Sequence, residues 1–302
     1  MIDKEYTVFT INWDAIEVTE KCIDSLNETI DRRHTNLVVI DNGSDDKNDI
    51  LRLKYLLELG RIDVLILHSK HVGFSCAFND AMLRVSGKII CEINNDCVVE
   101  KEWFDRAIDS FKNGKKVGAV CSSVREDRNF KKTDDEEVEA LHGAAIFIDR
   151  QAWLDVGPFD SKNFSPAYAE EADWCFRALR KGYKLIRCGS SFVFHVGSYT
   201  AKKKYSHFYI NSLRLTNRIK CRVYNWPIKR FYTKRAYLVR EYKKAKSHDT
   251  LHILMYAYLK NLLILPFSMR ERSRRFRKKM IGIRHVGKPE IILFSDSRHH
   301  GS

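Results

Sequence analysis

The sequence has no CxxC pair, no uninterrupted apolar stretch of membrane-spanning length and no basic-then-apolar start of the kind that marks a secretion signal. Its eight cysteines stand mostly among apolar neighbours, which favours buried free thiols over a disulfide framework or a zinc site. The most apolar stretch, residues 251–267, is interrupted by His252, Lys260 and Asn261 and is too short and too polar to span a bilayer comfortably. We therefore expect a cytoplasmic protein.

The first two hundred residues carry no excess of positive charge, since 27 Lys and Arg stand against 34 Asp and Glu, a net charge of −7. Residues 201–302 hold 26 Lys and Arg and 5 Asp and Glu, a net charge of +21, with a dense basic block at 270–279. Such asymmetry predicts a basic appendage for a polyanion, either nucleic acid or an anionic membrane surface. Because no base-stacking RNA or DNA module is recognisable, we favour the inner face of a membrane and expect no nucleic acid partner. A solvated basic bundle that serves solubility or homo-oligomer formation is the alternative.

The apolar periodicity predicts an α/β fold. Short apolar or β-branched runs alternate with segments of helical spacing, as in a mostly parallel, doubly wound sheet with helices on both faces. The expected strands are 6–12, 36–41, 61–67, 88–93, 117–124, 141–149 and 184–195, and the expected helices are 18–29, 49–59, 73–85, 101–112 and about 171–181. Long basic helices with interspersed aromatic residues follow, and we place the domain boundary near Tyr205.

Three polar residues, Asn94, Asn95 and Asp96, directly follow the apolar run at 88–93. Ligands bind at the carboxyl ends of strands in an open α/β sheet, and a carboxylate between amides there suits a divalent cation held against phosphate oxygens. The alternative is a polar turn that only ends a buried strand.

Asp41 ends another expected strand, so the carboxylates of Asp41 and Asp96 should share one rim of the sheet. It either accepts a hydrogen bond from the N–H of a uracil or thymine ring or caps the turn that follows it.

A cluster of three acids, Glu170, Glu171 and Asp173, lies within four residues. Their mutual repulsion makes a purely structural role harder to justify, although the dipole at a helix N-terminus also favours acids. The next residue, Trp174, is suited either to stacking on a sugar or to the core. His195 ends an apolar run, where a lone histidine is more often a core or turn residue than a metal ligand.

Several motifs occur in an order that resembles family 2 glycosyltransferases of the GT-A fold, most closely the rhamnosyltransferase-like and galactofuranosyltransferase-like branch. The resemblance covers about residues 5–225, and its motifs include the segment around Asn12, the turn 41–46, Gly73-Phe74 with Asn79, the tripeptide 94–96, Gly143-Ala144-Ala145, the cluster EEADWCFR at 170–177 and His195-Val196-Gly197-Ser198. It implies that the nucleotide-sugar is bound by Asn12, Asp41, Asn42, Ser44, Gly73, Phe74, Asn79, Asn94 and Asn95. It implies further that Asp96 and His195 bind the metal and that Gly143, Ala144 and Trp174 lie on the acceptor side.

The resemblance also implies an inverting transfer of a sugar from a UDP- or dTDP-sugar donor to a hydroxyl of a glycan or lipid-linked acceptor, as in the synthesis of cell-surface polysaccharide or glycoconjugates. Glu171 is the expected base, with Glu170 and Asp173 as fallback bases that otherwise shape the acceptor pocket. The expected cofactor is Mn²⁺ or Mg²⁺, and a histidine ligand favours Mn²⁺.

The expected domains are a catalytic domain at 1–205, with its nucleotide-sugar half at about 1–100 and its acceptor half at about 101–205, and a basic helical region at 206–302 that faces a membrane or partner. Two positions depart from the family pattern. Asn94 replaces an acid in the metal motif, and Glu171 stands where aspartate is common. An inactive sugar-nucleotide-binding subunit is therefore the alternative function.

Overall fold

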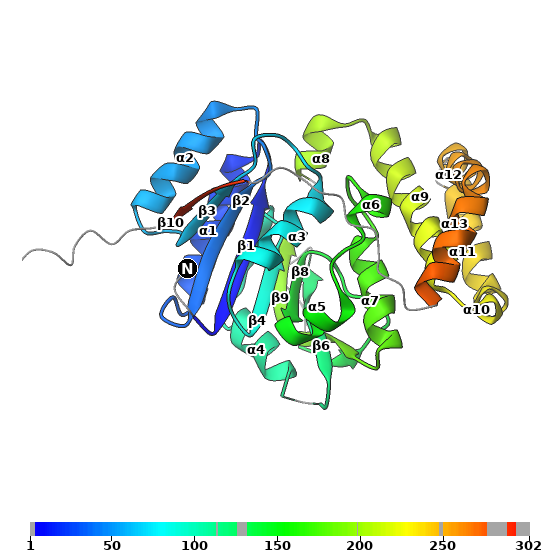
Figure 1. Ribbon diagram of the computed structural model, residues 1–302, viewed down its shortest axis with the longest axis horizontal. Helices are drawn as coiled ribbons and strands as arrows, with labels where there is room; N and C mark the ends of the chain where they lie inside the picture. Colours follow the sequence, from blue (N-terminus) through cyan, green and yellow to red (C-terminus); the bar gives the residue numbers. More distant parts are fainter. Residues whose placement is uncertain are drawn as a thin grey trace, which may run out of the picture.

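The computed structural model describes residues 4–112, 114–125, 132–197, 199–247, 250–276 and 289–293. Ser198, the end of the basic block at 277–279 and the last residues of the chain lie outside these ranges. The described chain forms a mixed sheet flanked by helices, followed by a group of helices at one side of the sheet (Figure 1).

The first half of the sheet is parallel and follows the expected alternation of strands and helices. Its members are β1 (Tyr6–Asn12), β2 (Thr35–Asp41), β3 (Val64–Leu67) and β4 (Ile89–Ile93), connected by α1 (Ile16–Thr29), α2 (Lys47–Glu58) and α3 (Phe74–Arg84). β1 lies between β2 and β4, so that Asn12 pairs in register with Asp41. The carboxyl ends of these strands therefore meet at one rim.

The second half of the sheet is mixed. It contains β5 (Cys97–Val99), β6 (Val117–Arg125), β7 (Glu136–Glu137), β8 (Ala145–Asp149) and β9 (Lys184–His195), with α4 (Trp103–Ser110), α5 (Arg150–Val156), α6 (Ser161–Phe164) and α7 (Glu170–Arg180). The strand order is β10-β3-β2-β1-β4-β8-β6-β9-β5, where β10 (Glu290–Leu293) is the antiparallel partner of β3. β8 runs antiparallel to both β4 and β6, whereas β6 and β9 are parallel.

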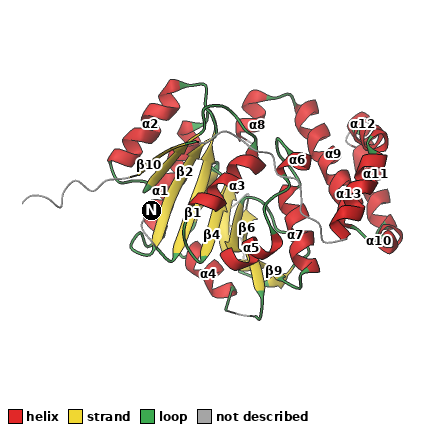
Figure 2. Cartoon of the chain, in the orientation of Figure 1, coloured by secondary structure: helices red, strands yellow, loops and turns green. Residues whose placement is uncertain are grey.

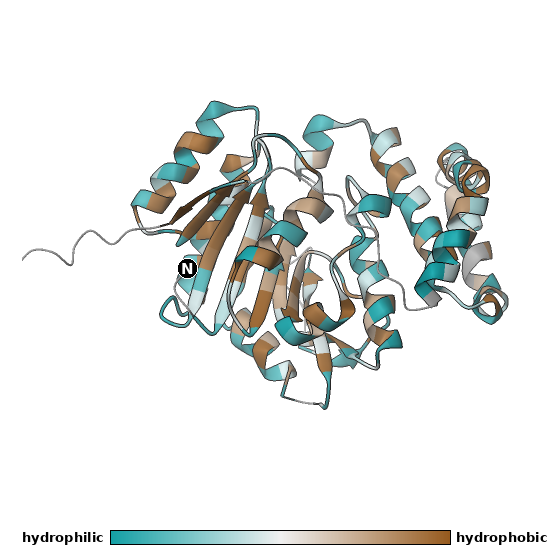
Figure 3. Ribbon diagram, viewed as in Figure 1, coloured by the Kyte–Doolittle hydropathy of each residue, from teal (hydrophilic) through white to brown (hydrophobic). Residues whose placement is uncertain are grey.

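Both faces of the sheet are covered, because its strands are apolar on both sides. One buried core joins the sheet to α1, α2 and α4, and the other joins it to α3, α5 and α7. Figure 2 shows these helices around the strands, and Figure 3 shows the strands as mostly hydrophobic with the hydrophilic residues gathered on the helices. The α/β fold expected from the sequence is confirmed.

The C-terminal extension is helical, as expected. It contains α8 (Tyr199–Lys204), α9 (His207–Asn225), α10 (Ile228–Thr233), α11 (Arg235–Ser247), α12 (Leu251–Leu263) and α13 (Leu265–Phe276). α9 packs against α7, and α12 and α13 pack against α9 (Figure 1). Among the described residues no single helix is long and apolar enough to cross a bilayer, although α12 and α13, which meet at a bend of 69°, pass the length and composition test together.

Candidate active site

A cavity of about 840 Å³ opens at the rim of the sheet, between the ends of the central strands and helices α3, α7, α8 and α9. Nine of the residues singled out in the sequence line it: Asn42, Phe74, Asn94, Asn95, Asp96, Gly143, Glu170, Glu171 and His195. The other eight do not: Asn12, Asp41, Ser44, Gly73, Asn79, Ala144, Asp173 and Trp174. The structure thus brings the metal motif, the histidine and two of the three clustered acids to one cavity.

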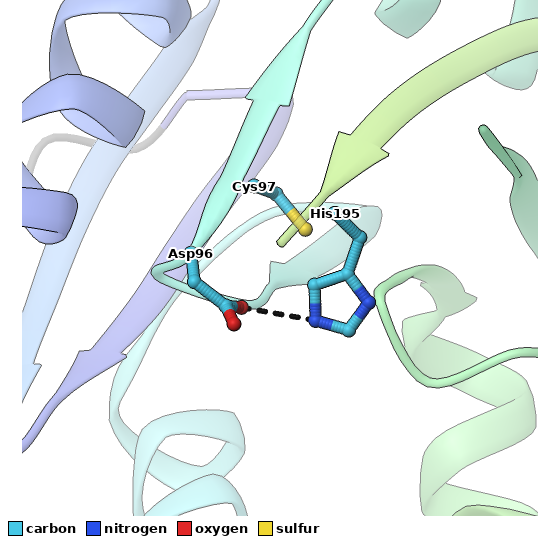
Figure 4. Close-up of side chains that lie close together, drawn as sticks. All are labelled: Asp96, Cys97 and His195. Atoms are coloured by element: carbon cyan, nitrogen blue, oxygen red, sulfur yellow. Dashed lines mark ion pairs between the residues drawn. The ribbon is translucent and has the colours of Figure 1, made fainter. Parts of the chain in front are cut away.

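Asp96 and His195 form the centre of this site. Asp96 lies in the turn between β4 and β5, and His195 ends β9 opposite Cys97 of β5. The His195 Nε2 atom lies 3.0 Å from Asp96 Oδ1, and the two side chains point toward one another in Figure 4. The backbone N–H of Tyr199 donates to Asp96 Oδ2 at 3.1 Å. Burial raises the pKa of Asp96, but the hydrogen bond and charge of His195 outweigh it and leave this pKa below its ordinary value, so the carboxylate is ionised and ready to bind a cation.

Cys97 completes a group of three side chains whose ligand atoms lie within 4.8 Å of one another (Figure 4). Its thiol is fully buried and donates to the Ala144 carbonyl at 3.5 Å, and burial raises its pKa well above the ordinary value. A protonated thiol is a poor metal ligand, since the thiolate is the binding form. The set that fits a divalent metal is therefore Asp96 and His195, one oxygen and one imidazole nitrogen that face an open cavity.

Glu170 and Glu171 begin α7 after Ala169, which has left-handed backbone torsions and offers no side-chain cap. The Glu170 side chain is buried and its Oε2 atom has no hydrogen-bond partner among the described residues. Glu171 is partly exposed to the cavity and lies beside Gly143, where a Cβ atom would be 3.7 Å from Glu171 Cγ. Burial raises the pKa of Glu171, and the charge of Arg218 opposes this shift. A carboxyl group with a raised pKa at a cavity wall is suited to accept a proton near neutral pH.

Asp173 and Trp174 do not have the surroundings that the sequence suggested. Asp173 is fully buried and is paired with Arg177 at 3.0 Å and with Arg275 of α13. Trp174 is 1% exposed and donates its indole N–H to the Gly157 carbonyl at 3.1 Å. Trp174 therefore lies in the core, which is the alternative that the sequence left open. This position corrects the expectation that Trp174 stacks on an acceptor sugar. Asp173 is a poor fallback base, because two arginines hold its carboxylate away from the cavity.

The turn after β2 is built by a buried hydrogen-bond network. Asp41 is fully buried and accepts from the Asn12 side chain at 2.9 Å and from the backbone N–H and hydroxyl of Ser44 at 2.9 and 2.6 Å. Gly43 has φ +72°, and a Cβ there would lie 2.0 Å from the Lys70 carbonyl carbon, so only glycine fits. Asp41 therefore caps the turn, which is the second of the two roles that the sequence left open.

Gly73 and Asn79 also position the cavity wall rather than line it. Asn79 receives the N–H of Phe159 and donates to its carbonyl, both at 2.9 Å, and so fastens α3 to the segment before α7. Gly73 has φ +88° at the start of α3, and a Cβ there would approach Ser165 Oγ to 2.9 Å. Both residues fix the helix that carries Phe74 into the cavity.

Several residues that line the cavity were missed in the sequence. Trp13 and His71 stack at one end of it with ring centroids 3.7 Å apart, and the Lys204 ammonium lies 5.1 Å from the Trp13 ring. α8 covers this end, because Lys203 donates to the Asp14 carbonyl and Lys204 pairs with the Asp14 carboxylate. Arg214, Arg218, Tyr168, His142 and Glu92 are among the other lining residues that were missed. Of these, Glu92 left the clearest signal, as an acid inside an otherwise apolar strand.

The sequence model of glycosyl transferase family 2 matches residues 7–171, more than half of the chain. The chain belongs to this family. A curated relative, the glucosyl-dolichyl phosphate glucuronosyltransferase of Haloferax volcanii, is 23% identical over 167 residues, which cover 47% of this chain and 52% of the relative. The chain thus matches about half the length of that relative.

Solved structures with the same fold include GalNAc-T7 with UDP, GalNAc and Mn²⁺ (TM-score 0.62, 13% identity, covering 86% of this chain and 57% of that one). The mannosyltransferase PcManGT of Pyrobaculum calidifontis with GDP-Man and Mn²⁺ has a TM-score of 0.58 and 17% identity, covering 93% and 77% of the two chains. TarS of S. aureus has a TM-score of 0.54 and 12% identity, covering 83% and 55%. The expected family and GT-A fold are confirmed, and membership of a glycosyltransferase family supports the expected enzyme class. None of these proteins singles out the rhamnosyltransferase-like or galactofuranosyltransferase-like branch.

Proposed function

We propose that this glycosyltransferase moves a sugar with inversion from a nucleoside diphosphate donor, UDP or dTDP, to a hydroxyl of a glycan or lipid-linked acceptor. The observation that carries the proposal is that Asp96 and His195 on one side and Glu171 on the other line one cavity. The solved relatives that contain UDP or GDP-Man also contain Mn²⁺, which supports a divalent metal at the same kind of site.

Each half of the reaction has its own residues in the cavity. Glu171 accepts the proton of the acceptor hydroxyl as that oxygen attacks the anomeric carbon, and the bond between that carbon and the diphosphate oxygen breaks. General base catalysis of this kind contributes about 10²–10⁴-fold. Asp96 and His195 would hold the metal, which when bound neutralises charge on the diphosphate leaving group. Asn94 and Asn95 stand beside Asp96 and offer amide groups rather than further charge.

A panel of nucleotide sugars tests this function by thermal stabilisation with Mn²⁺ present. A true donor at about 100 times its Kd stabilises the folded protein by roughly 2.7 kcal/mol. We expect UDP- or dTDP-sugars to stabilise the wild type with Mn²⁺ and to fail with the Asp96→Ala variant. Stabilisation by every nucleotide alike, with or without metal, would contradict the proposal. An inactive binding subunit, the alternative function, would be stabilised but would release no nucleoside diphosphate.

We also propose that the extension places the enzyme on an anionic membrane surface that presents the acceptor. α12 and α13 expose a continuous set of large apolar side chains next to basic residues such as Lys260 and Arg270. This apolar surface consists of Met255, Tyr256, Tyr258, Leu259, Leu262, Leu263, Leu265, Phe267 and Met269. Amphipathic helices with basic and aromatic residues bind in the headgroup region of anionic bilayers.

Liposome sedimentation tests the membrane proposal. The full chain should bind vesicles that contain phosphatidylserine, and binding should fall as salt rises, because charges are screened over about 8 Å at physiological ionic strength. Leu263→Asp, at a side chain that is 82% exposed on α12, should weaken binding. The matched control is Leu83→Asp on α3, 74% exposed and away from this surface, which should not. Equal losses in both variants would contradict the proposal.

A further inference from the structure

Glu92 is a buried acid that the protein itself does not satisfy. It is the fourth residue of β4, it is 1% exposed, and neither carboxyl oxygen has a hydrogen-bond partner among the described residues. Burying a carboxyl group without a partner is costly, and native proteins rarely keep such a group without a reason. Glu92 lines the cavity, so a bound ligand is the available partner.

The strand geometry fixes where Glu92 points. Side chains alternate along β4, so Cys91 and Ile93 contribute to the core beneath α1 and α4, and Ile90 contributes to the core beneath α3 and α7. Glu92 therefore projects to the side of α3 and α7, with Phe9 and Ile146 as its register partners on the neighbouring strands. The cavity lining also contains the apolar side chains of Ile11, Phe78, Ile146 and Phe159.

Glu92 shares the cavity with both reactive groups, Asp96 and Glu171. Burial, followed by repulsion from Asp96 and from Glu171, raises the pKa of Glu92 well above the ordinary value. Glu92 in turn adds to the raised pKa of Glu170, after burial and the charge of Glu171. A sugar that joins a diphosphate at Asp96 to an acceptor oxygen at Glu171 has to occupy the cavity that Glu92 lines.

Resting on the proposed function, we propose that Glu92 is a specificity-determining residue that hydrogen-bonds a hydroxyl of the transferred sugar and favours an uncharged sugar over a uronic acid. A sugar hydroxyl can both donate to and accept from the carboxyl group of Glu92, and the apolar wall can contact the faces of the ring. A sugar carboxylate would instead lie in the same water-poor space as Glu171, which acts as a base only when ionised, and these like charges would repel strongly.

The test is a set of binding titrations on the full chain with Mn²⁺ present. The probes are UDP, dTDP, dTDP-glucose, UDP-glucose, UDP-galactose, UDP-N-acetylglucosamine and UDP-glucuronate, and the proteins are the wild type, Glu92→Gln and Glu92→Leu. We expect the wild type to bind the best neutral sugar at least tenfold more tightly than UDP-glucuronate. Glu92→Leu should weaken the best neutral sugar by about 10-fold or more, as expected for a lost hydrogen bond in a buried site, and leave UDP within twofold. Glu92→Gln keeps a donor and an acceptor and should stay close to the wild type for neutral sugars.

The outcomes separate this proposal from the function on which it rests. If UDP binds to all three proteins and Glu92→Leu binds every neutral sugar as tightly as the wild type, or if UDP-glucuronate binds most tightly of all, the role of Glu92 is refuted while the function stands. If no probe binds with Mn²⁺, the proposed function is refuted, and the role of Glu92 with it.

A stability measurement distinguishes a ligand contact from a structural role. Replacing an unpartnered buried acid by leucine removes a desolvation penalty, so Glu92→Leu should raise the denaturation midpoint of the ligand-free protein. A structural role predicts a lower midpoint together with equal losses of UDP and UDP-sugar affinity, and that result would overturn the proposal.

Discussion

Arg275 of α13 forms an ion pair with Asp173 of α7, and both side chains are almost inaccessible to solvent. The same guanidinium pairs with Asp160, which is also buried, and Asn225 of α9 donates to Asp173 at 2.8 Å. The last described helix of the extension is thereby connected to the helix that begins with Glu170 and Glu171. We infer that α13 holds α7 in place, so that the described helices of the extension support the rest of the fold as well as covering one side of it.

Arg275→Met should destabilise the protein strongly, because it leaves two buried carboxylates without their shared cation. Breaking a buried ion pair from one side typically costs about 3–5 kcal/mol. Chemical denaturation of the two proteins measures the difference. The matched control is Arg33→Met, because the Arg33 side chain is 84% exposed and pairs with Asp31, which is 44% exposed, at the surface. Exposed pairs contribute about 0–1 kcal/mol, so equal effects in both variants would contradict the inferred connection.

Glu171→Gln should reduce transfer by about 10²–10⁴-fold, because the amide keeps the shape of the side chain but cannot accept the proton. Binding of the nucleotide donor should hardly change, since the base acts on the acceptor. Steady-state transfer and donor titration measure the two effects separately. Glu170→Gln is the control and should lose less turnover. Normal turnover in Glu171→Gln together with inactive Glu170→Gln would move the base to Glu170.

The pH dependence of kcat/KM should show the raised pKa of Glu171. The base works only when ionised, so activity should fall as the pH decreases through this pKa, and the midpoint should lie above the ordinary range of a glutamate. Arg218 opposes the shift through its charge, so Arg218→Gln should move the midpoint to higher pH. A midpoint in the ordinary range, or a move to lower pH in this variant, would contradict the assignment.

Trp13→Ala should weaken UDP binding by about tenfold, since base–aromatic stacking contributes about 1–3 kcal/mol and we propose that the Trp13 ring, which lines the cavity, stacks on the nucleobase. Trp13→Phe should retain most of the affinity.

We also expect UDP and dTDP to inhibit transfer more strongly than ADP or GDP at matched concentration, as proposed for a pyrimidine donor. Competition assays measure both effects, and unchanged UDP affinity in Trp13→Ala would remove this ring from the nucleotide site.

The sequence predicted the first half of the fold well because each strand and helix there has its own local pattern. Val8, Leu37 and Cys91 lie in apolar runs that need burial on both faces, which is typical of parallel strands. The direction of β8 was not predictable, since residues 145–149 are equally apolar for a parallel or an antiparallel neighbour. The boundary near Tyr205 stays a prediction, but the ion pair of Arg275 in α13 with Asp173 in α7 indicates that a chain ending near Asn225 would lose stability.

The site was predictable where residue type alone restricts the chemistry. An acid and a histidine at the ends of apolar runs, Asp96 and His195, do lie together. The role of Asp173 was not predictable, because its partner Arg275 is 102 residues away in the chain. Asp41 was ambiguous, because a turn cap and a nucleobase contact require the same carboxylate. Glu92 left a signal as an acid in an apolar strand, but the sequence could not show that its carboxyl oxygens lack hydrogen-bond partners among the described residues.

The most direct test of the central claim is release of nucleoside diphosphate from a panel of nucleotide sugars by the wild type and by Asp96→Ala, each with Mn²⁺ and with EDTA. The account predicts release by the wild type with Mn²⁺ for at least one UDP- or dTDP-sugar, and no release in EDTA or by Asp96→Ala at any metal concentration. Equal release in EDTA, or full activity of Asp96→Ala, would contradict the metal site formed by Asp96 and His195 and with it the proposed reaction.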